Sequence, residues 1–310
     1  MARNPETSVR FSERHPLLFG LMLIVMAVAL FMGAMAFFRG LGSKSRPLTG
    51  DKLGLCKIEG MITDAGEVVG FLRELGQDDS VKGVLLRIDS PGGAVAPSQE
   101  LYQAVKALAA KKPVVVSMGT AAASGGYYAA APATLIMANP GSITASIGVR
   151  AEYVNLQGLM EKIGLKSDIL ASGKMKAAGS PTQQTTPEQR AYLLALVMDL
   201  HQQFVADVAA GRGLSEDVVA KLADGRALTG RQALEARLVD KLGGQAAAMD
   251  VLRDMVKLGE KTPVLEGPEK KQPWLPRLLG ATLSALAQAL VEAPARATSS
   301  SGDLLLQYRQ

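Results

Sequence analysis

Apolar positions follow two different periods in the first half of the chain. Between residues 53 and 138, short apolar runs alternate with stretches in which apolar residues recur at helical spacing. This alternation predicts βαβ units around a largely parallel sheet. The runs are continuously apolar, so both faces of the sheet should be covered. The expected strands are "LGLCKIEGMI", "KGVLLRID", "KPVVVSMG" and "TLIMANP", and the expected helices are "GEVVGFLREL" and "PSQELYQAVKALAA".

The second half of the chain is predicted to be mostly helical. In "TPEQRAYLLALVMDLHQQFVADVAAGRG", Thr186 is a helix N-cap, Pro187 suits the first helical position, and Gln189 completes a capping box, so a long helix should follow. A shorter helix is expected after Ser215. Another is expected in "TGRQALEARLVDKLGG", ending at the glycine pair.

A long apolar stretch lies near the N-terminus. Residues 17–38 contain no charged side chain, and a helix of this length crosses a hydrocarbon core of about 30 Å. The stretch therefore predicts a transmembrane helix in contact with lipid. Ala34-Met35-Ala36 resembles the small-x-small site of a cleaved signal peptide, but the apolar stretch is longer than the usual signal core.

Charge counts do not orient this segment, because basic residues flank it on both sides. A short tail, residues 1–16, before a large domain suits an anchor whose N-terminus stays in the cytoplasm while the domain is exported. The predicted order continues with a linker (39–52), a catalytic domain (53–258), and a segment containing a linker, an apolar helix and a mobile tail (259–310). That apolar helix could lie on a membrane, pack on another subunit or be buried on its own domain.

Composition narrows the class of protein. The 310 residues are 48% hydrophobic, which is enough for a sizeable core. Most of the net charge of +5 lies in residues 1–52, so the rest of the chain is nearly neutral and lacks the basic stripe of a nucleic-acid binder. A single cysteine, Cys56, excludes an internal disulfide and a cysteine-based metal cluster.

One serine stands alone among small residues in "GTAAASGGYYAAAPA", residues 119–133. Ser124 follows an expected strand and opens an expected helix, so its hydroxyl would lie at the positive end of that helix, where an oxyanion is stabilised. Small neighbours would let a substrate backbone approach closely. The same pattern also fits an ordinary N-cap serine.

A glycine turn ends the preceding strand in "RIDSPGGAV", residues 87–95. Glycines there allow backbone conformations that aim free N–H groups into a cleft, although the motif also occurs as a plain turn. Together with Ser124, it places two candidate elements at neighbouring strand ends. The edge of the sheet formed by such ends is the usual position of an α/β active site.

Histidine is poorly placed to activate this serine. His15 precedes the apolar stretch, and His201 lies in the middle of the predicted long helix. A lysine base is the alternative, but lowering a lysine pKa from about 10.4 to about 7 costs roughly 4 kcal/mol and requires an apolar environment. "ILASGKMKAAGSP" offers Lys174 and Lys176 between an expected strand and a loop, although most lysines are solvated surface residues.

Four motifs in this order, "LRIDSPGGAV", "VSMGTAAASGGYYAAA", "NPGSITASIGV" and "SGKMKAAGSP", resemble the bacterial signal peptide peptidases of the SppA type in their short, membrane-anchored form. The resemblance covers about residues 53–244. It implies a ClpP/crotonase-like α/β fold of repeated ββα units, with a C-terminal helical extension and one preceding transmembrane helix.

The resemblance also implies a Ser-Lys dyad. Ser124 would be the nucleophile and Lys176 the general base, while Gly93 and Gly125 would donate N–H groups to the oxyanion. Ser146 matches the serine that hydrogen-bonds the lysine amine. The mechanism implied is acyl transfer without a metal or a cofactor.

One position departs from the family pattern. Family members usually carry an aspartate after the dyad lysine, whereas this chain has Ala177. A side chain at position 177 is therefore not expected to support the lysine. The prediction of the dyad itself is unaffected. Lys174 would then be a surface neighbour of the dyad.

Partners and location are implied by the same resemblance. Expected substrates are remnant signal peptides and other hydrophobic or unfolded peptides, and the expected assembly is a homo-oligomeric ring or dome in which neighbouring protomers can complete the dyad. The enzyme would span the bacterial inner membrane once, with its catalytic domain on the extracytoplasmic side. The alternatives are a crotonase-type acyl-CoA enzyme, which would not require Ser124, and an inactive membrane scaffold.

Overall fold

The computed structural model describes residues 15–42 and 50–268 of the chain. Residues 16–42 form one helix, and residues 50–268 contain the sheet and the helices packed around it. The predicted tail before residue 15, the central part of the first linker, and the predicted apolar helix and tail after residue 268 lie outside the described residues.

A single, largely parallel sheet forms the centre of the domain, as the sequence predicts. Its main path runs in the order β6-β5-β3-β2-β1-β8, and β4 pairs with β3 and β7. Every pairing is parallel except that of β5 with β6. The strands are β1 (Lys52–Glu59), β2 (Val81–Ser90), β3 (Val114–Ala123), β4 (Leu135–Ala138), β5 (Ile143–Ala145), β6 (Ala227–Thr229), β7 (Lys241–Leu242) and β8 (Val264–Gly267).

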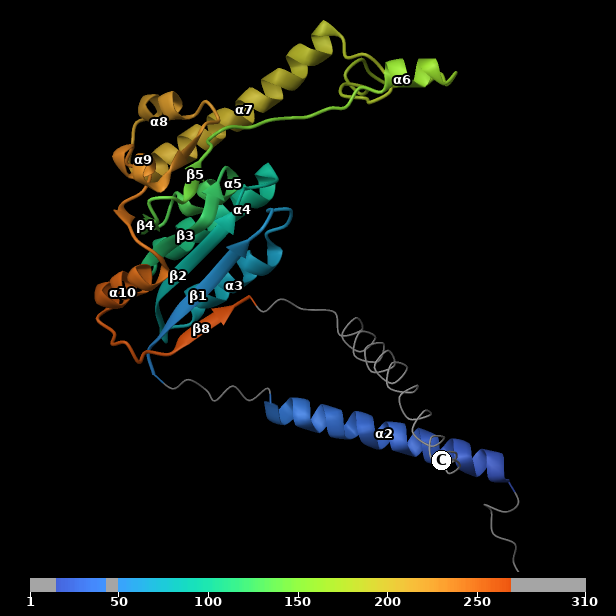
Figure 1. Cartoon of the computed structure of the whole chain (residues 1–310), viewed down its shortest axis with the longest axis vertical. Helices are drawn as coiled ribbons and strands as arrows, with labels where there is room; N and C mark the ends of the chain where they lie inside the picture. The colour runs from blue at the N-terminus through green and yellow to red at the C-terminus, as the bar shows by residue number, and fades with distance from the viewer. Residues whose placement is uncertain (1–14, 43–49, 269–310) are drawn as a thin grey trace, which may run out of the picture.

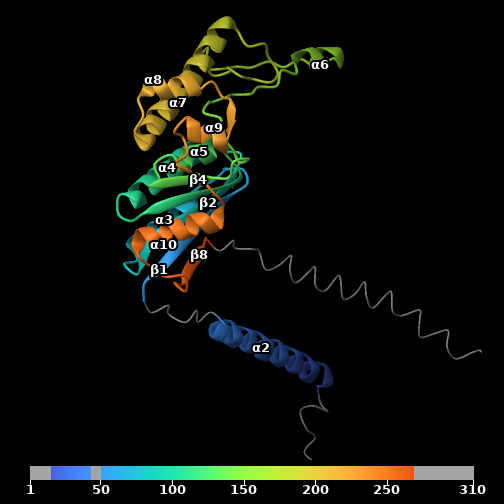
Figure 2. The ribbon, with the colours of Figure 1, turned by 60° about the vertical axis from the view of Figure 1, so that its left-hand side comes forward.

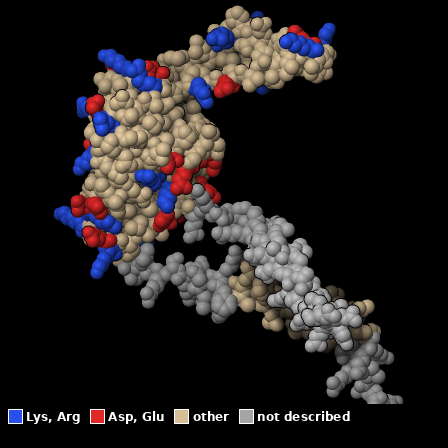
Figure 3. Space-filling view, viewed as in Figure 1, with Lys and Arg blue, Asp and Glu red and all other residues tan. Residues whose placement is uncertain are grey.

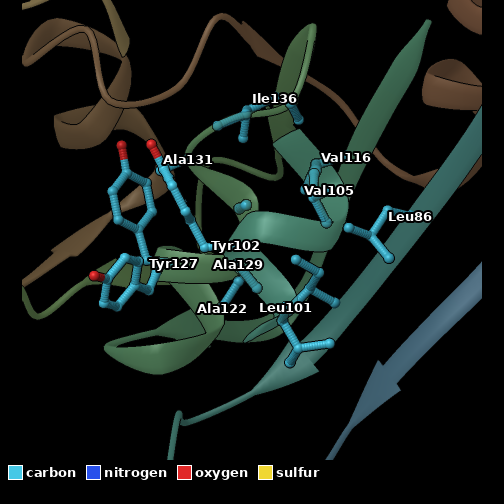
Figure 4. Packing of buried hydrophobic residues seen from close by; sticks show 14 of the residues in the cluster. Leu86, Leu101, Tyr102, Val105, Val116, Ala122, Tyr127, Ala129, Ala131 and Ile136 are labelled. Atoms are coloured by element: carbon cyan, nitrogen blue, oxygen red, sulfur yellow. The ribbon is translucent and has the colours of Figure 1, made fainter. Parts of the chain in front are cut away.

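Helices cover both faces of this sheet (Figures 1 and 2). On one face, Val84 and Leu86 of β2 join a buried cluster with side chains of α3 (Gly66–Gln77), α4 (Val95–Ala109) and α5 (Gly125–Ala130). Figure 4 shows part of this cluster, including Leu86 of β2 and Leu101 of α4. On the other face, Leu85 joins Leu252 of α10 (Gln245–Val256). Both faces are therefore dry, which explains the continuous apolar runs.

The helix predicted to reach the glycine pair is much shorter in the structure. α9 (Gly230–Glu235) has a Thr229 capping box but stops before Arg237, whose φ of 61° lies in the left-handed region. Leu238 and Val239 then turn inward and are buried. The chain enters β7 before reaching the glycines, because burying these two side chains outweighs the helical spacing of the segment.

Two further predictions differ from the structure. β8 lies within residues 260–273, which were predicted to be the linker at the start of the 259–310 segment, and it extends the sheet beside β1. A Cβ on Gly267 of this strand would lie 2.8 Å from the ring of Phe71, so the strand packs closely on α3. The strand expected before Lys174 is absent, and the chain there is irregular.

A helical extension projects from the sheet. α7 (Pro187–Arg212) has the predicted Thr186 capping box, α8 (Glu216–Leu222) follows, and the short α6 (Gln157–Lys162) lies within residues 150–186, here called the arm. The arm and the first half of α7 extend away from the domain in both views (Figures 1 and 2).

This extension exposes many apolar side chains. In Figure 3 its charged side chains are separated by stretches of uncharged surface. Exposed apolar surfaces of this kind are typical of interaction sites. The exposed large apolar side chains of the arm and of the first half of α7 are Tyr153, Val154, Leu156, Leu159, Ile163, Leu165, Leu170, Tyr192, Leu194, Leu196 and Met198.

The predicted N-terminal span is helical. α2 (Pro16–Gly42) contains a 20-residue stretch, Pro16–Met35, with a mean hydropathy of 2.7 and no buried side chains. It is a candidate membrane span by length and composition. α7 passes the same test with a mean hydropathy of only 1.2, but part of it is buried in the domain.

Candidate active site

Ser124 occupies a strained turn between β3 and α5. Its φ of 51° and ψ of −120° lie in a region that non-glycine residues rarely adopt, at a cost of about 1–3 kcal/mol. The turn is held from both sides: the Ser124 N–H donates to the carbonyl of Ala145 at 2.7 Å, and its carbonyl accepts from the N–H of Tyr128 at 2.9 Å. A strained serine between a strand and a helix is also found in the nucleophile turns of α/β hydrolases.

The glycine turn after β2 lies against this serine. A Cβ on Gly92, whose φ is 101°, would be 2.8 Å from the Cβ of Ser124. A Cβ on Gly93 would be 2.0 Å from the carbonyl oxygen of Ile62. Gly92 also donates its N–H to the Ser90 hydroxyl at 3.1 Å. Position 92 therefore needs glycine for the two turns to meet, and position 93 needs glycine for the chain to pass beside the Ile62 backbone.

Two backbone N–H groups are available beside the serine. A Cβ on Gly125 would lie 3.3 Å from the Gly93 nitrogen, so the two glycines are close neighbours. Gly125 is the first residue of α5, where the helix itself offers no acceptor. Within the described residues, neither N–H donates to another backbone or side-chain acceptor outside regular secondary structure. The predicted oxyanion donors thus have the required proximity, and their role remains a prediction.

Ser146 lies next to the Ser124 turn. β5 pairs with β3 so that Ala145 is opposite Ala123, which places the two serines directly after paired residues. Ser146 has a φ of 52°, and its hydroxyl donates to the carbonyl of Gly225 at 3.2 Å. Its lone pairs remain available to accept from an amine.

Lys176 lies apart from this group. It is solvent-exposed in the arm, in a turn of residues 173–179 called here the lysine turn. The Lys176 N–H donates to the carbonyl of Gly173 at 3.0 Å, and the side chain of Gln189 donates to the carbonyl of Lys174 at 3.0 Å. The lysine turn is therefore attached to the first turn of α7. A single protomer brings four of the five predicted site residues together and leaves Lys176 outside.

Asp89 is a supporting residue that the sequence analysis did not single out. The β2–β3 pairing shifts between Ile88 and Ser90, so β3 bulges just before Ser124. The Asp89 carboxylate accepts from the N–H of Ala121 in this bulge at 3.1 Å, and a Cβ on Gly119 would lie 2.6 Å from its Cγ. The polar "DS" at the end of a buried strand was the available signal for this contact.

Gly125→Ala is expected to destabilise the site through a direct clash. The new Cβ would lie 2.2 Å from the hydroxyl of buried Ser98, and overpacking of this kind costs about 1–3 kcal/mol. Urea unfolding should show the loss, and adding Ser98→Ala should restore part of it because the clashing oxygen is gone. If the free energy of unfolding lost in the double variant equals the sum of the losses in the two single variants, this packing would be contradicted.

A strained serine beside two backbone donors, at the edge of a parallel sheet, is an arrangement expected of a serine hydrolase. Comparison with known proteins agrees. Residues 58–143 match the Clp protease family, and residues 106–259 match peptidase family S49.

Individual relatives give the same result. A Synechocystis protein named "Putative protease" is 42% identical over 204 residues, covering 66% of this chain and 74% of the relative. A Methanocaldococcus jannaschii protein of the same description is 39% identical over 209 residues, 67% of each chain. An Enterococcus faecium protein named "Putative signal peptide peptidase SppA" is 35% identical over 229 residues, 69% of this chain and 66% of the relative. The chain belongs to peptidase family S49 and is a serine peptidase.

Proposed function

We propose that this peptidase is a membrane-anchored endopeptidase that degrades remnant signal peptides and other hydrophobic or unfolded peptides. The observation that carries the proposal is the strained Ser124 turn, packed against the glycine turn that ends β2. The name of the Enterococcus faecium relative supports the substrate class. An acyl-CoA enzyme would not require the strain at Ser124.

The proposed chemistry is acyl transfer. An uncharged Lys176 amine takes the proton of the Ser124 hydroxyl, and the oxygen attacks the peptide carbonyl. The N–H groups of Gly93 and Gly125 hold the oxyanion, and the lysine returns the proton to the leaving amine. Water, deprotonated by the same amine, then attacks the acyl-enzyme and releases the second product. Ser146 would accept a hydrogen bond from the amine and orient it.

In this proposal, the dyad forms between neighbouring protomers. The arm, which contains Lys176, extends away from the sheet (Figures 1 and 2). The exposed apolar side chains of the arm need a partner surface, and a second copy can supply it. A head-to-tail contact of this kind closes into a ring, as in the proposed ring or dome. Burial in that contact would also provide the apolar environment that an uncharged lysine requires.

The membrane anchor is part of the proposal. α2 would span the inner membrane once, with the catalytic domain on the extracytoplasmic side. Its exposed apolar surface supports contact with lipid. This position would hold the peptidase beside signal peptides left in the bilayer.

Labelling and product analysis with the full chain in detergent would test this function. A fluorophosphonate probe should label the wild type at Ser124 only, and a peptide with an apolar signal-sequence core should be cut faster than a scrambled version in which charges interrupt that core. Ser124→Ala is the control for both measurements. Labelling at another residue, or equal rates for the two peptides, would overturn the assignment of the site or of the substrate class, respectively.

A further inference from the structure

Helices α4, α5 and α7 meet at one polar junction. The hydroxyl of Tyr128 in α5 donates to the Asp207 carboxylate at 2.6 Å, and the hydroxyl of Tyr102 in α4 donates to the Asp207 backbone carbonyl at 3.0 Å. The Tyr128 ring stacks on Phe204, with centroids 4.2 Å apart and planes inclined by 11°. We call these four residues the tyrosine junction.

Each of these helices is connected to a different part of the proposed catalytic apparatus. α4 begins two residues after Gly93. The Tyr128 N–H binds the carbonyl of Ser124, so the same residue fixes the nucleophile turn and reaches α7. Gln189 in the first turn of α7 holds the lysine turn. The tyrosine junction therefore links the elements that carry the oxyanion donors, the nucleophile and the base.

Among the described residues, α7 packs on the domain near its C-terminal end. Its buried side chains all lie from Phe204 onward, whereas Tyr192 and Leu194 in the first half are exposed. From Phe204 back to Pro187, the helix extends for roughly 26 Å, so a tilt of about 10° at the junction would move its first turn by roughly 4–5 Å. Proton transfer needs the base within about 3 Å of the hydroxyl, so small tilts matter.

We propose that Asp207 is a positioning residue that, through Tyr128, fixes the angle of α7 and so the place at which the arm presents Lys176. The inference rests on the proposed dyad. A short hydrogen bond to a carboxylate is strong and directional, unlike the ring stacking of Tyr128 on Phe204 beside it. Burial raises the pKa of Tyr128, so its hydroxyl remains protonated and able to donate at neutral pH.

Removing the Tyr128 hydroxyl while keeping its ring tests the tyrosine junction. In the full chain in detergent, Tyr128→Phe should lower kcat for peptide hydrolysis about tenfold and leave KM within about twofold, because the base is misplaced while the substrate groove is intact. Asp207→Ala should behave in the same way. Asp207→Asn retains an oxygen acceptor and should recover most of the lost kcat.

Tyr127→Phe is the matched control. This substitution also removes a buried hydroxyl from α5, but that hydroxyl donates to the carbonyl of Leu238 at 2.9 Å and not to α7. It should lower the melting temperature to a similar extent and leave kcat unchanged. Equal kcat values for Tyr128→Phe and Tyr127→Phe, or no recovery in Asp207→Asn, would overturn the inference.

Lys176→Ala, measured beside these variants, separates the two possible failures. If Lys176→Ala is inactive and the Tyr128 and Tyr127 variants behave alike, the proposed dyad stands and the positioning role of Asp207 is wrong. If Lys176→Ala keeps full activity, the proposed base is wrong and the inference built on it is overturned as well.

Discussion

Ser124→Ala is expected to lower peptide hydrolysis by at least about 10⁴-fold, because the variant loses the hydroxyl that forms the acyl-enzyme. The fold should survive, since the substitution removes one oxygen and keeps the turn. Fluorophosphonate labelling should disappear together with activity. Residual turnover near the wild-type level would contradict the assignment of the nucleophile.

Ser124→Gly tests the strain at the same position. Glycine adopts a φ of 51° without steric cost, so the variant should gain about 1 kcal/mol in free energy of unfolding while losing activity. Thermal or urea unfolding of the Gly and Ala variants, compared with the wild type, gives the measurement. A less stable Gly variant would show that the turn is not strained in solution.

Lys176→Ala is expected to lower kcat/KM by about 10³-fold or more, because the serine hydroxyl loses its base. Lys174→Ala is the matched control, being two residues away in the same turn, and it should stay within about threefold of the wild type. Steady-state kinetics on one fluorogenic peptide give both values. A larger loss for Lys174→Ala than for Lys176→Ala would reverse the assignment of the two lysines.

Local chemistry explains which parts of the fold the sequence could predict. The continuous apolar runs of β1 to β3 reflect burial on both faces, and the Thr186 capping box is a contact between near neighbours in the chain. Both signals are complete within a short stretch of sequence. The position of Ser124 between a strand and a helix was predictable for the same reason.

The structure differs from the sequence-based predictions where contacts between residues far apart in the chain determine the local structure. β8 is four residues long in a mostly polar stretch, and it becomes a strand because β1 offers an unpaired edge. The helix that begins at Gly230 stops near Arg237 because Leu238 and Val239 are buried against the domain. In both cases, the local pattern is weaker than the tertiary contact.

The candidate active site also has one part that the sequence could predict and one part that it could not. The glycine turn and Ser124 follow neighbouring parallel strands, so their meeting at one edge could be inferred from the order of elements. The position of Lys176 could not be inferred in this way. The arm that carries it makes most of its contacts with itself, such as the hydrogen bond from the Leu156 N–H to the Pro181 carbonyl at 2.7 Å. Its proposed catalytic position depends on a second protomer.

A mixture of two inactive variants tests the shared dyad most directly. Ser124→Ala and Lys176→Ala should each be inactive alone, but co-expression in equal amounts should restore about a quarter of wild-type activity, since a head-to-tail ring then contains interfaces with an intact serine and an intact lysine. Native mass spectrometry would establish that the oligomers are mixed. Mixed oligomers without activity would contradict a dyad built from neighbouring protomers.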